Sequence, residues 1–153
     1  MANDINLTNA IVGSNGDDIL SGIPTAQNSL FGYDGNDLLL GADRDDILIG
    51  GDGNDILGGG PGSVADWFEF DRYDGRDIVT DFGPEEKVSA GIKPPPLDRI
   101  LLHDGLPMDI QRVIETATDD PGSGGTVLHY GHTEILLQGV PRGDLSPDWF
   151  IVG

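Results

Sequence analysis

Hydrophobic and polar positions alternate in short blocks over residues 13–58. A mostly polar, glycine-rich stretch is followed each time by a brief apolar one. The blocks divide into four nine-residue units, at 13–21, 32–40, 41–49 and 50–58, and one ten-residue unit at 22–31. Every unit begins with glycine. Each also contributes one leucine from its apolar block: Leu20, Leu30, Leu39, Leu48 and Leu57.

This pattern predicts an all-β fold built as a parallel solenoid. The polar half of each unit favours a tight turn, because glycine adopts the positive φ that other residues resist. The apolar half predicts a very short strand with its leucine pointing inward. Such a strand is not stable alone, so consecutive turns of chain are expected to stack and to bury one leucine each.

Acidic residues occupy the sixth position of the nine-residue units: Asp18, Asp37, Asp46 and Asp55. Asn28 takes that place in the ten-residue unit. The turns offer carboxylate and carbonyl oxygens but neither cysteine nor histidine, a donor set that suits Ca²⁺ better than Mg²⁺. One Asp-Gly turn alone would be an ordinary turn with a solvated acid. Five units in register favour calcium binding.

The units resemble the repeats-in-toxin (RTX) calcium-binding family, whose consensus is G-G-x-G-x-D-x-U-x, with U a large apolar residue. The resemblance implies a parallel β-roll in which units n and n+2 stack on the same side. It therefore implies a first column of Asp18, Asp37 and Asp55, and a second column of Asn28, Asp46 and Asp66.

The resemblance also implies the calcium ligands, which are carbonyls and one aspartate from each of two stacked turns. One site joins Ser14, Gly16 and Asp18 to Gly32, Asp34 and Asp37. A second joins Tyr33, Gly35 and Asp37 to Gly50, Asp52 and Asp55. On the other side, Ala42, Arg44 and Asp46 face Gly59, Pro61 and Asp66. The remaining predicted ligands are Gly41, Asp43, Gly51, Gly53 and Asn28, and about three to five ions are expected in all.

Two units depart from the consensus. The unit at 22–31 has Pro24, an insertion and Asn28, so the site that it shares with Asp46 is expected to be weak or empty. Arg44 replaces a turn glycine and adds a positive charge, although its carbonyl remains able to coordinate an ion.

Residues 83–153 are predicted to form a β-rich cap after a roll at 13–82, with residues 1–12 as an amino-terminal cap. Asp77 and Asp81 resemble the D-x-I-x-D-F element that follows the roll in serralysin-type domains, and are either ligands of a capping ion or surface acids. Residues 83–98 are predicted to form a loop and 99–105 a strand. Residues 108–120 fit a helix or a strand, and residues 125–140 a hairpin.

The chain of 153 residues carries 8 Lys and Arg against 27 Asp and Glu, a formal net charge of −19. This balance repels nucleic acid and anionic membrane surfaces and attracts cations. No cysteine is present to form a disulfide. No stretch is apolar enough for a signal peptide or a membrane span, so membrane insertion is not expected.

The final residues, DWFIVG, resemble the uncleaved carboxy-terminal signal of proteins exported by type I secretion. The alternative is a last strand packed into the core. With the repeats, the signal predicts a secreted, extracellular protein that uses type I secretion machinery. Such a chain is expected to stay largely unfolded where calcium is scarce and to fold outside the cell when calcium binds.

No H-E-x-x-H, G-x-S-x-G or phosphate-binding loop motif is present, so catalysis is not expected. One candidate role is a calcium-binding module with a structural or binding function. The alternative is an accessory module that binds an extracellular polysaccharide, like the R-modules of alginate epimerases. Its cationic groove would come from Arg72, Arg76 and Lys87. An enzyme with an unrecognised site is a third, weaker option. Outward-facing apolar side chains are expected to be covered by the carboxy-terminal half or by a second subunit in a homodimer: Phe31, Leu38, Leu40, Ile47 and Ile49.

Overall fold

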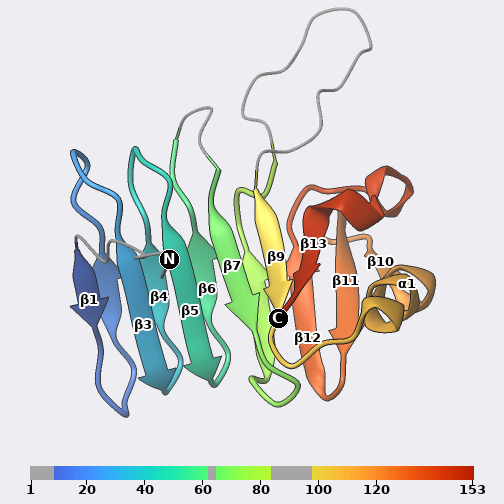
Figure 1. Ribbon diagram of the computed structural model, residues 1–153, viewed down its shortest axis with the longest axis horizontal. Helices are drawn as coiled ribbons and strands as arrows, with labels where there is room; N and C mark the ends of the chain where they lie inside the picture. The colour runs from blue at the N-terminus through green and yellow to red at the C-terminus, as the bar shows by residue number, and fades with distance from the viewer. Residues whose placement is uncertain (1–8, 62–64, 84–97) are drawn as a thin grey trace, which may run out of the picture.

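Two β-sheets face each other in the computed structural model (Figure 1). The structure describes residues 9–61, 65–83 and 98–153. The six-stranded sheet runs in the order β1-β3-β5-β7-β9-β13, with every neighbouring pair parallel. Its strands are β1 (Ala10–Val12), β3 (Ser29–Asp34), β5 (Ile47–Asp52), β7 (Trp67–Phe70), β9 (Arg99–Leu102) and β13 (Phe150–Val152).

The seven-stranded sheet runs in the order β2-β4-β6-β8-β12-β11-β10. It is parallel from β2 to β12 and antiparallel from β12 to β10. Its strands are β2 (Ile19–Ser21), β4 (Leu38–Leu40), β6 (Ile56–Gly58), β8 (Arg76–Val79), β12 (Thr133–Leu137), β11 (Gly125–Tyr130) and β10 (Thr118–Asp120). The chain alternates between the sheets from β1 to β8, which makes this part a parallel β-roll (Figure 1).

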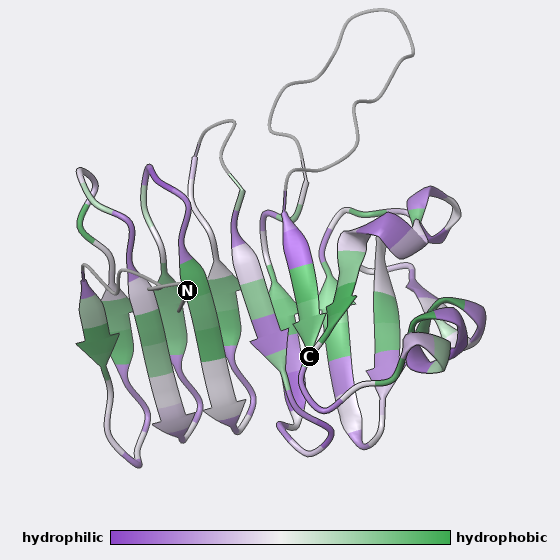
Figure 2. Cartoon of the chain, viewed as in Figure 1, coloured by the Kyte–Doolittle hydropathy of each residue, from purple (hydrophilic) through white to green (hydrophobic). Residues whose placement is uncertain are grey.

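The repeat leucines form the core of the roll. Leu30 and Leu48 are in register in one sheet, and Leu39 and Leu57 in the other, with all four completely buried. Figure 2 shows the result as hydrophobic bands that cross neighbouring strands. Because each three-residue strand buries little else, the roll has a thin core whose stability depends on stacking.

The carboxy-terminal part extends both sheets instead of covering them. Strands β9 and β13 continue the six-stranded sheet, and the β11–β12 hairpin continues the seven-stranded one. The expectation that this half covers the outward apolar residues is therefore wrong, because a chain that lengthens a sheet leaves its outer face open. Leu40 is exposed, and Phe31, Leu38, Ile47 and Ile49 are half-buried. The roll also begins earlier than residue 13, because β1 pairs in parallel with β3.

Helix α1 (Pro107–Thr116) packs against β11 and β13 at the far end of the molecule (Figure 1). Residues 108–120 thus contain a helix followed by strand β10. Two short 3-10 helices, η1 (Arg142–Asp144) and η2 (Pro147–Trp149), lead into β13. Within the described ranges, no helix has the length and hydrophobicity that a membrane span requires. Glu85, Glu86 and Lys87, with most of the predicted 83–98 loop, lie outside the described residues.

Candidate metal centre

The first column of aspartates runs along one side of the roll, as the n and n+2 stacking predicts. The backbone N–H of Asp18 donates to Oδ1 of Asp37 at 2.8 Å, and the N–H of Asp37 donates to Oδ1 of Asp55 at 2.8 Å. The N–H of Asp55 donates to Oδ1 of Asp77 at 2.9 Å. Asp77, which precedes Ile78 and Val79 of strand β8, therefore continues the column.

The second column runs along the other side with the same bonds. The N–H groups of Asn28 and Asp46 donate to Oδ1 of Asp46 and Asp66 at 2.7 and 2.9 Å. The N–H of Asp66 donates to Oδ1 of Asp98 at 3.0 Å. Asp98 was missed from the sequence because residues 67–97 break the nine-residue period. The available signal was local: Asp98 lies two residues before a buried Ile100, as Asp55 lies two before Leu57.

The second carboxylate oxygens distinguish these turns from ordinary ones. Oδ2 of Asp37, Asp46 and Asp55 is buried and has no hydrogen-bond partner among the described residues. A buried charged oxygen without a partner is strongly unfavourable, so these three atoms favour binding a cation or a proton. Asp18 differs, because its Oδ2 accepts bonds from the N–H and Oγ of Ser14 at 2.6 and 2.9 Å.

Glycine at the first turn position leaves room beside each unpartnered oxygen. A Cβ atom on Gly32 would overlap Oδ2 of Asp37 and the carbonyl oxygen of Gly50. The same clash with the turn's own aspartate would arise at Gly41, Gly50 and Gly59. These positions therefore hold glycine because a carboxylate and a stacked carbonyl approach the backbone closely there.

Backbone carbonyls also approach the stacked turns closely. The carbonyl oxygens of Tyr33 and Gly35 lie against Gly51 and Gly53 of the next turn, and that of Ala42 lies against Gly60. Tyr33 and Ala42 have φ values of 80° and 142°, in the region that favours glycine. Side chains with a Cβ are strained in this conformation, so the turn geometry is imposed by the stack.

The donor set fits calcium. The described residues contain no group of three or more Asp, Glu, His or Cys side chains that could hold a metal by themselves. The predicted sites pair two carboxylates with carbonyl oxygens, which are the hard oxygen ligands of Ca²⁺, and this ligand set stays a prediction. The other members of the predicted ligand set lie in the same turns: Ser14, Gly16, Asp34, Gly41, Asp43, Arg44, Asp52, Gly59 and Pro61.

Burial raises the pKa of the column aspartates. The pKa is about 6 for Asp55 and Asp98 and about 8 for Asp66 and Asp77, and those of Asp37 and Asp46 are also raised. Removal from water is the main cause, and neighbouring carboxylates add to it. Without a cation, folding therefore buries negatively charged aspartates close to one another, which is unfavourable.

Asp81 and Asn28 show turns that are satisfied without an ion. Both oxygens of Asp81 accept backbone bonds at 2.9 Å, from the N–H groups of Gly59 and Gly60. The amide of Asn28 donates to Oδ1 of Asp46 at 2.8 Å and to the carbonyls of Ala26 and Ile23 at 3.0 and 3.3 Å. Asp81 thus anchors the end of the roll, and Asn28 supplies an N–H donor where the other turns leave an oxygen unpartnered.

The fold and these turns define a parallel β-roll with an oxygen-lined column on each side. Residues 7–22 and 31–63 match the family model of the RTX calcium-binding nonapeptide repeat, in four copies. The resemblance to RTX proteins and the fold class are thus confirmed, and the chain carries RTX calcium-binding repeats. No curated protein sequence gives a significant match.

Two solved structures show the same fold. Extracellular lipase LipA from Serratia marcescens superimposes on 94% of this chain, with a TM-score of 0.64 and 25% identity. The AlgE6R2 subunit of the mannuronan C5-epimerase of Azotobacter vinelandii superimposes on 93%, with a TM-score of 0.61 and 27% identity. This chain spans 21% of the lipase and 91% of the AlgE6R2 subunit.

Proposed function

We propose that this chain is a secreted calcium-binding module whose β-roll folds when Ca²⁺ binds. The observation that carries the proposal is the set of buried, unpartnered Oδ2 atoms of Asp37, Asp46 and Asp55. The carboxylates of both columns would hold the ions, together with carbonyls such as those of Tyr33, Gly35 and Ala42. Bound calcium supplies positive charge among these oxygens, and its role is structural.

Calcium dependence of folding follows from the charge and the thin core. A formal charge of −19 opposes compaction, and the core offers one buried leucine per repeat. In the absence of metal, the buried aspartates add a desolvation penalty. The free energy of calcium binding then becomes free energy of folding, because the unfolded chain has no preformed site.

Export by type I secretion is the part of the proposal that explains where folding occurs. It is supported by the DWFIVG ending and by the likeness to an extracellular lipase. Trp149 and Phe150 of that ending are buried in the folded chain, and β13 pairs with β9. The segment would therefore serve as a signal before folding and as a sheet strand afterwards.

An accessory role in polysaccharide binding is the second candidate, favoured by the likeness to a subunit of a mannuronan C5-epimerase. The predicted cationic groove gives it little support. Arg72 pairs with Asp109 at 2.9 Å and Arg76 with Glu134 at 2.6 Å, so both charges are already balanced. A binding assay on a neutral and an acidic polysaccharide would separate the two candidates.

A calcium titration of chelator-treated protein, followed by far-UV circular dichroism, tests the main proposal. We expect a cooperative gain of β signal with Ca²⁺ and none with Mg²⁺ at the same concentration. A spectrum that is folded from the start and indifferent to calcium would contradict it. The variant Asp119→Asn provides a matched control, since Asp119 is an exposed acid outside both columns.

A further inference from the structure

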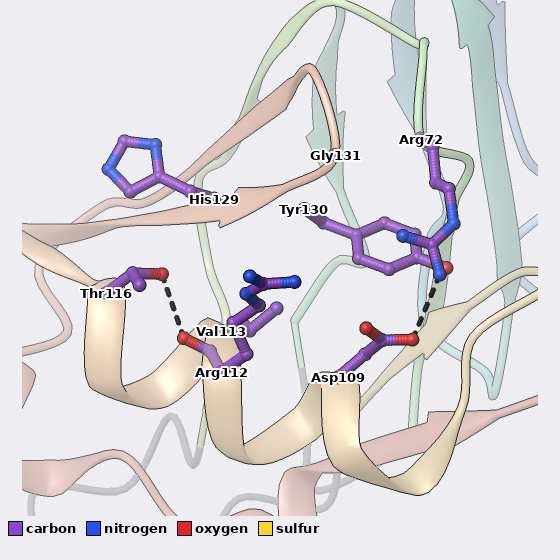
Figure 3. A pocket seen from close by; sticks show the side chains of 8 residues that line it. All are labelled: Arg72, Asp109, Arg112, Val113, Thr116, His129, Tyr130 and Gly131. Atoms are coloured by element: carbon purple, nitrogen blue, oxygen red, sulfur yellow. Dashed lines mark hydrogen bonds and ion pairs between the residues drawn. The ribbon is translucent and has the colours of Figure 1, made fainter.

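A small cavity of about 270 Å³ brings two arginines together in the carboxy-terminal part of this acidic molecule (Figure 3). Its walls come from helix α1, strand β11 and the turn between β7 and β8. Arg72, Arg112 and His129 line it, with Asp109, Thr116 and Tyr130. The whole chain has only 8 Lys and Arg against 27 acids, so two arginines at one cavity are unusual here.

Arg72 forms a fixed wall of the cavity. Its guanidinium bonds Oδ2 of Asp109 at 2.9 Å and lies 4.6 Å from the centre of the Tyr130 ring. The hydroxyl of Tyr130 donates to the carbonyl of His103 at 2.6 Å, which fixes the ring in turn. This side of the cavity is therefore rigid and its charge is balanced.

Arg112 has no such partner. Its guanidinium makes no hydrogen bond or ion pair with any residue that the structure describes. In Figure 3 it lies in the space between helix α1 and β11, facing Tyr130, while the His129 ring points away. Asp109 interacts electrostatically with both arginines, and Asp71 and Asp104 lie near Arg72 and Tyr130. What the cavity offers a ligand is therefore the Arg112 guanidinium, which has no hydrogen-bond partner among the described residues.

We propose that this cavity binds a small organic anion with a single carboxylate group. A guanidinium matches the two oxygens of a carboxylate in a planar pair of hydrogen bonds. Val113 and the Tyr130 ring provide an apolar surface for the body of the ligand. The volume is slightly below that of pockets for drug-sized molecules, which limits the ligand to a small one. This site is separate from the aspartate columns and does not depend on the calcium proposal.

An NMR titration of ¹⁵N-labelled protein in calcium buffer tests the site. The probes are glucuronate, a sugar acid, and N-acetylglycinate, which resembles the end of a peptide. Glucose and inorganic phosphate, at matched ionic strength, are the controls. We expect saturable shifts of the Arg112 Nε–H and the Tyr130 and Gly131 amides with at least one carboxylate. Which carboxylate binds identifies the source of the ligand. Equal shifts with glucose, tighter binding of phosphate, or no saturable shift would overturn the proposal.

Matched arginine variants complete the test. Arg112→Gln is expected to weaken carboxylate binding about tenfold, because it removes a charge-assisted pair of hydrogen bonds. Arg142→Gln makes the same charge change at an exposed site outside the cavity and should leave binding unchanged. Equal effects of the two variants would overturn the proposal. A chain that proved folded without calcium would remain suitable for this test, so failure here is distinct from failure of the proposed function.

Discussion

Two turns of the roll, one in each column, satisfy their polar groups in different ways. In the turn at 32–37, Oδ1 of Asp37 accepts the N–H of Asp18, and Oδ2 is buried with no partner. In the turn at 22–28, Asn28 uses its amide to donate to Ala26 and Asp46, and its Oδ1 accepts the N–H of Ile23 at 3.0 Å. The amide of Asn28 thus satisfies its own turn, whereas the carboxylate of Asp37 leaves one buried oxygen without a partner.

This difference indicates that the stacking of turns and the binding of a metal depend on different residues. Asn28 and Asp37 both preserve the register of their strands, so the fold does not require an acid at the sixth position. Under the proposed function, the acid instead makes the turn depend on a calcium ion. Each prediction below changes one side of this comparison, in order of decreasing effect.

Asp55→Asn is expected to have the largest effect, because Asp55 lies between Asp37 and Asp77 in the first column. Loss of its charge should raise the calcium concentration at the folding midpoint about tenfold or more. Circular dichroism during a calcium titration measures the shift. An unchanged midpoint, equal to that of the Asp119→Asn control, would show that the column does not bind the ion.

The metal-free protein should lose stability as pH rises. The pKa values of Asp66 and Asp77 are about 8 in the folded chain, because burial raises them above the ordinary 3.8. The folded state then binds more protons than the unfolded state, so the free energy of unfolding falls between about pH 4 and pH 8. Far-UV circular dichroism of calcium-free protein at pH 5 and pH 8 measures the folded fraction, and more β signal at pH 8 than at pH 5 would contradict the prediction.

Asn28→Asp should convert the self-satisfied turn into a metal-dependent one. We expect one additional bound calcium ion per chain and lower stability in chelator, since the new carboxylate loses the amide bonds to Ala26 and Asp46. Equilibrium dialysis gives the stoichiometry. Asn15→Asp, an exposed position in the turn at 13–18, is the matched control and should add no ion. An unchanged ion count in both variants would argue that the sixth position does not decide calcium binding.

Tyr33→Gly should give the smallest effect, a stabilisation of about 1 kcal/mol in saturating calcium. The φ of 80° strains a side chain with a Cβ, and the Tyr33 ring is 53% exposed, so little packing is lost. Urea unfolding measures the change. Tyr73→Gly removes an exposed ring from a residue outside the positive-φ region, where it stacks on His132, and should not stabilise.

The repetitive part of the fold could be predicted because each unit has the same pattern, a glycine-rich turn followed by a short apolar strand. Glycine and one leucine in every unit, with an acid at the sixth position of four units, predicted stacked turns, and the resemblance to RTX repeats then placed Asp18, Asp37 and Asp55 in one column. The hairpin at 125–137 and the strand at 99–102 also followed from short-range patterns.

The rest depends on contacts that have no period in the sequence. Asp98 joins the second column across a gap of 32 residues, and Asp81 bonds the N–H groups of Gly59 and Gly60 from outside the repeats. Residues 108–120 combine β-branched and helix-forming residues, so the local sequence fits either structure. Packing against β11 and β13 favours the helix. Covering of the outer faces by the carboxy-terminal half was wrongly predicted, because a sequence pattern does not show whether later strands extend a sheet or pack on it. Covering by a second subunit stays a prediction.

A crystal structure of the protein grown with calcium tests the central claim most directly. We predict calcium ions between stacked turns, within about 2.3–2.6 Å of Oδ2 of Asp37 and Asp55 and of carbonyl oxygens from both turns. The amide of Asn28 should keep its bonds to Asp46 and Ala26. Oδ2 atoms bonded only to water or to protein N–H groups, with no ion between the turns, would contradict the account.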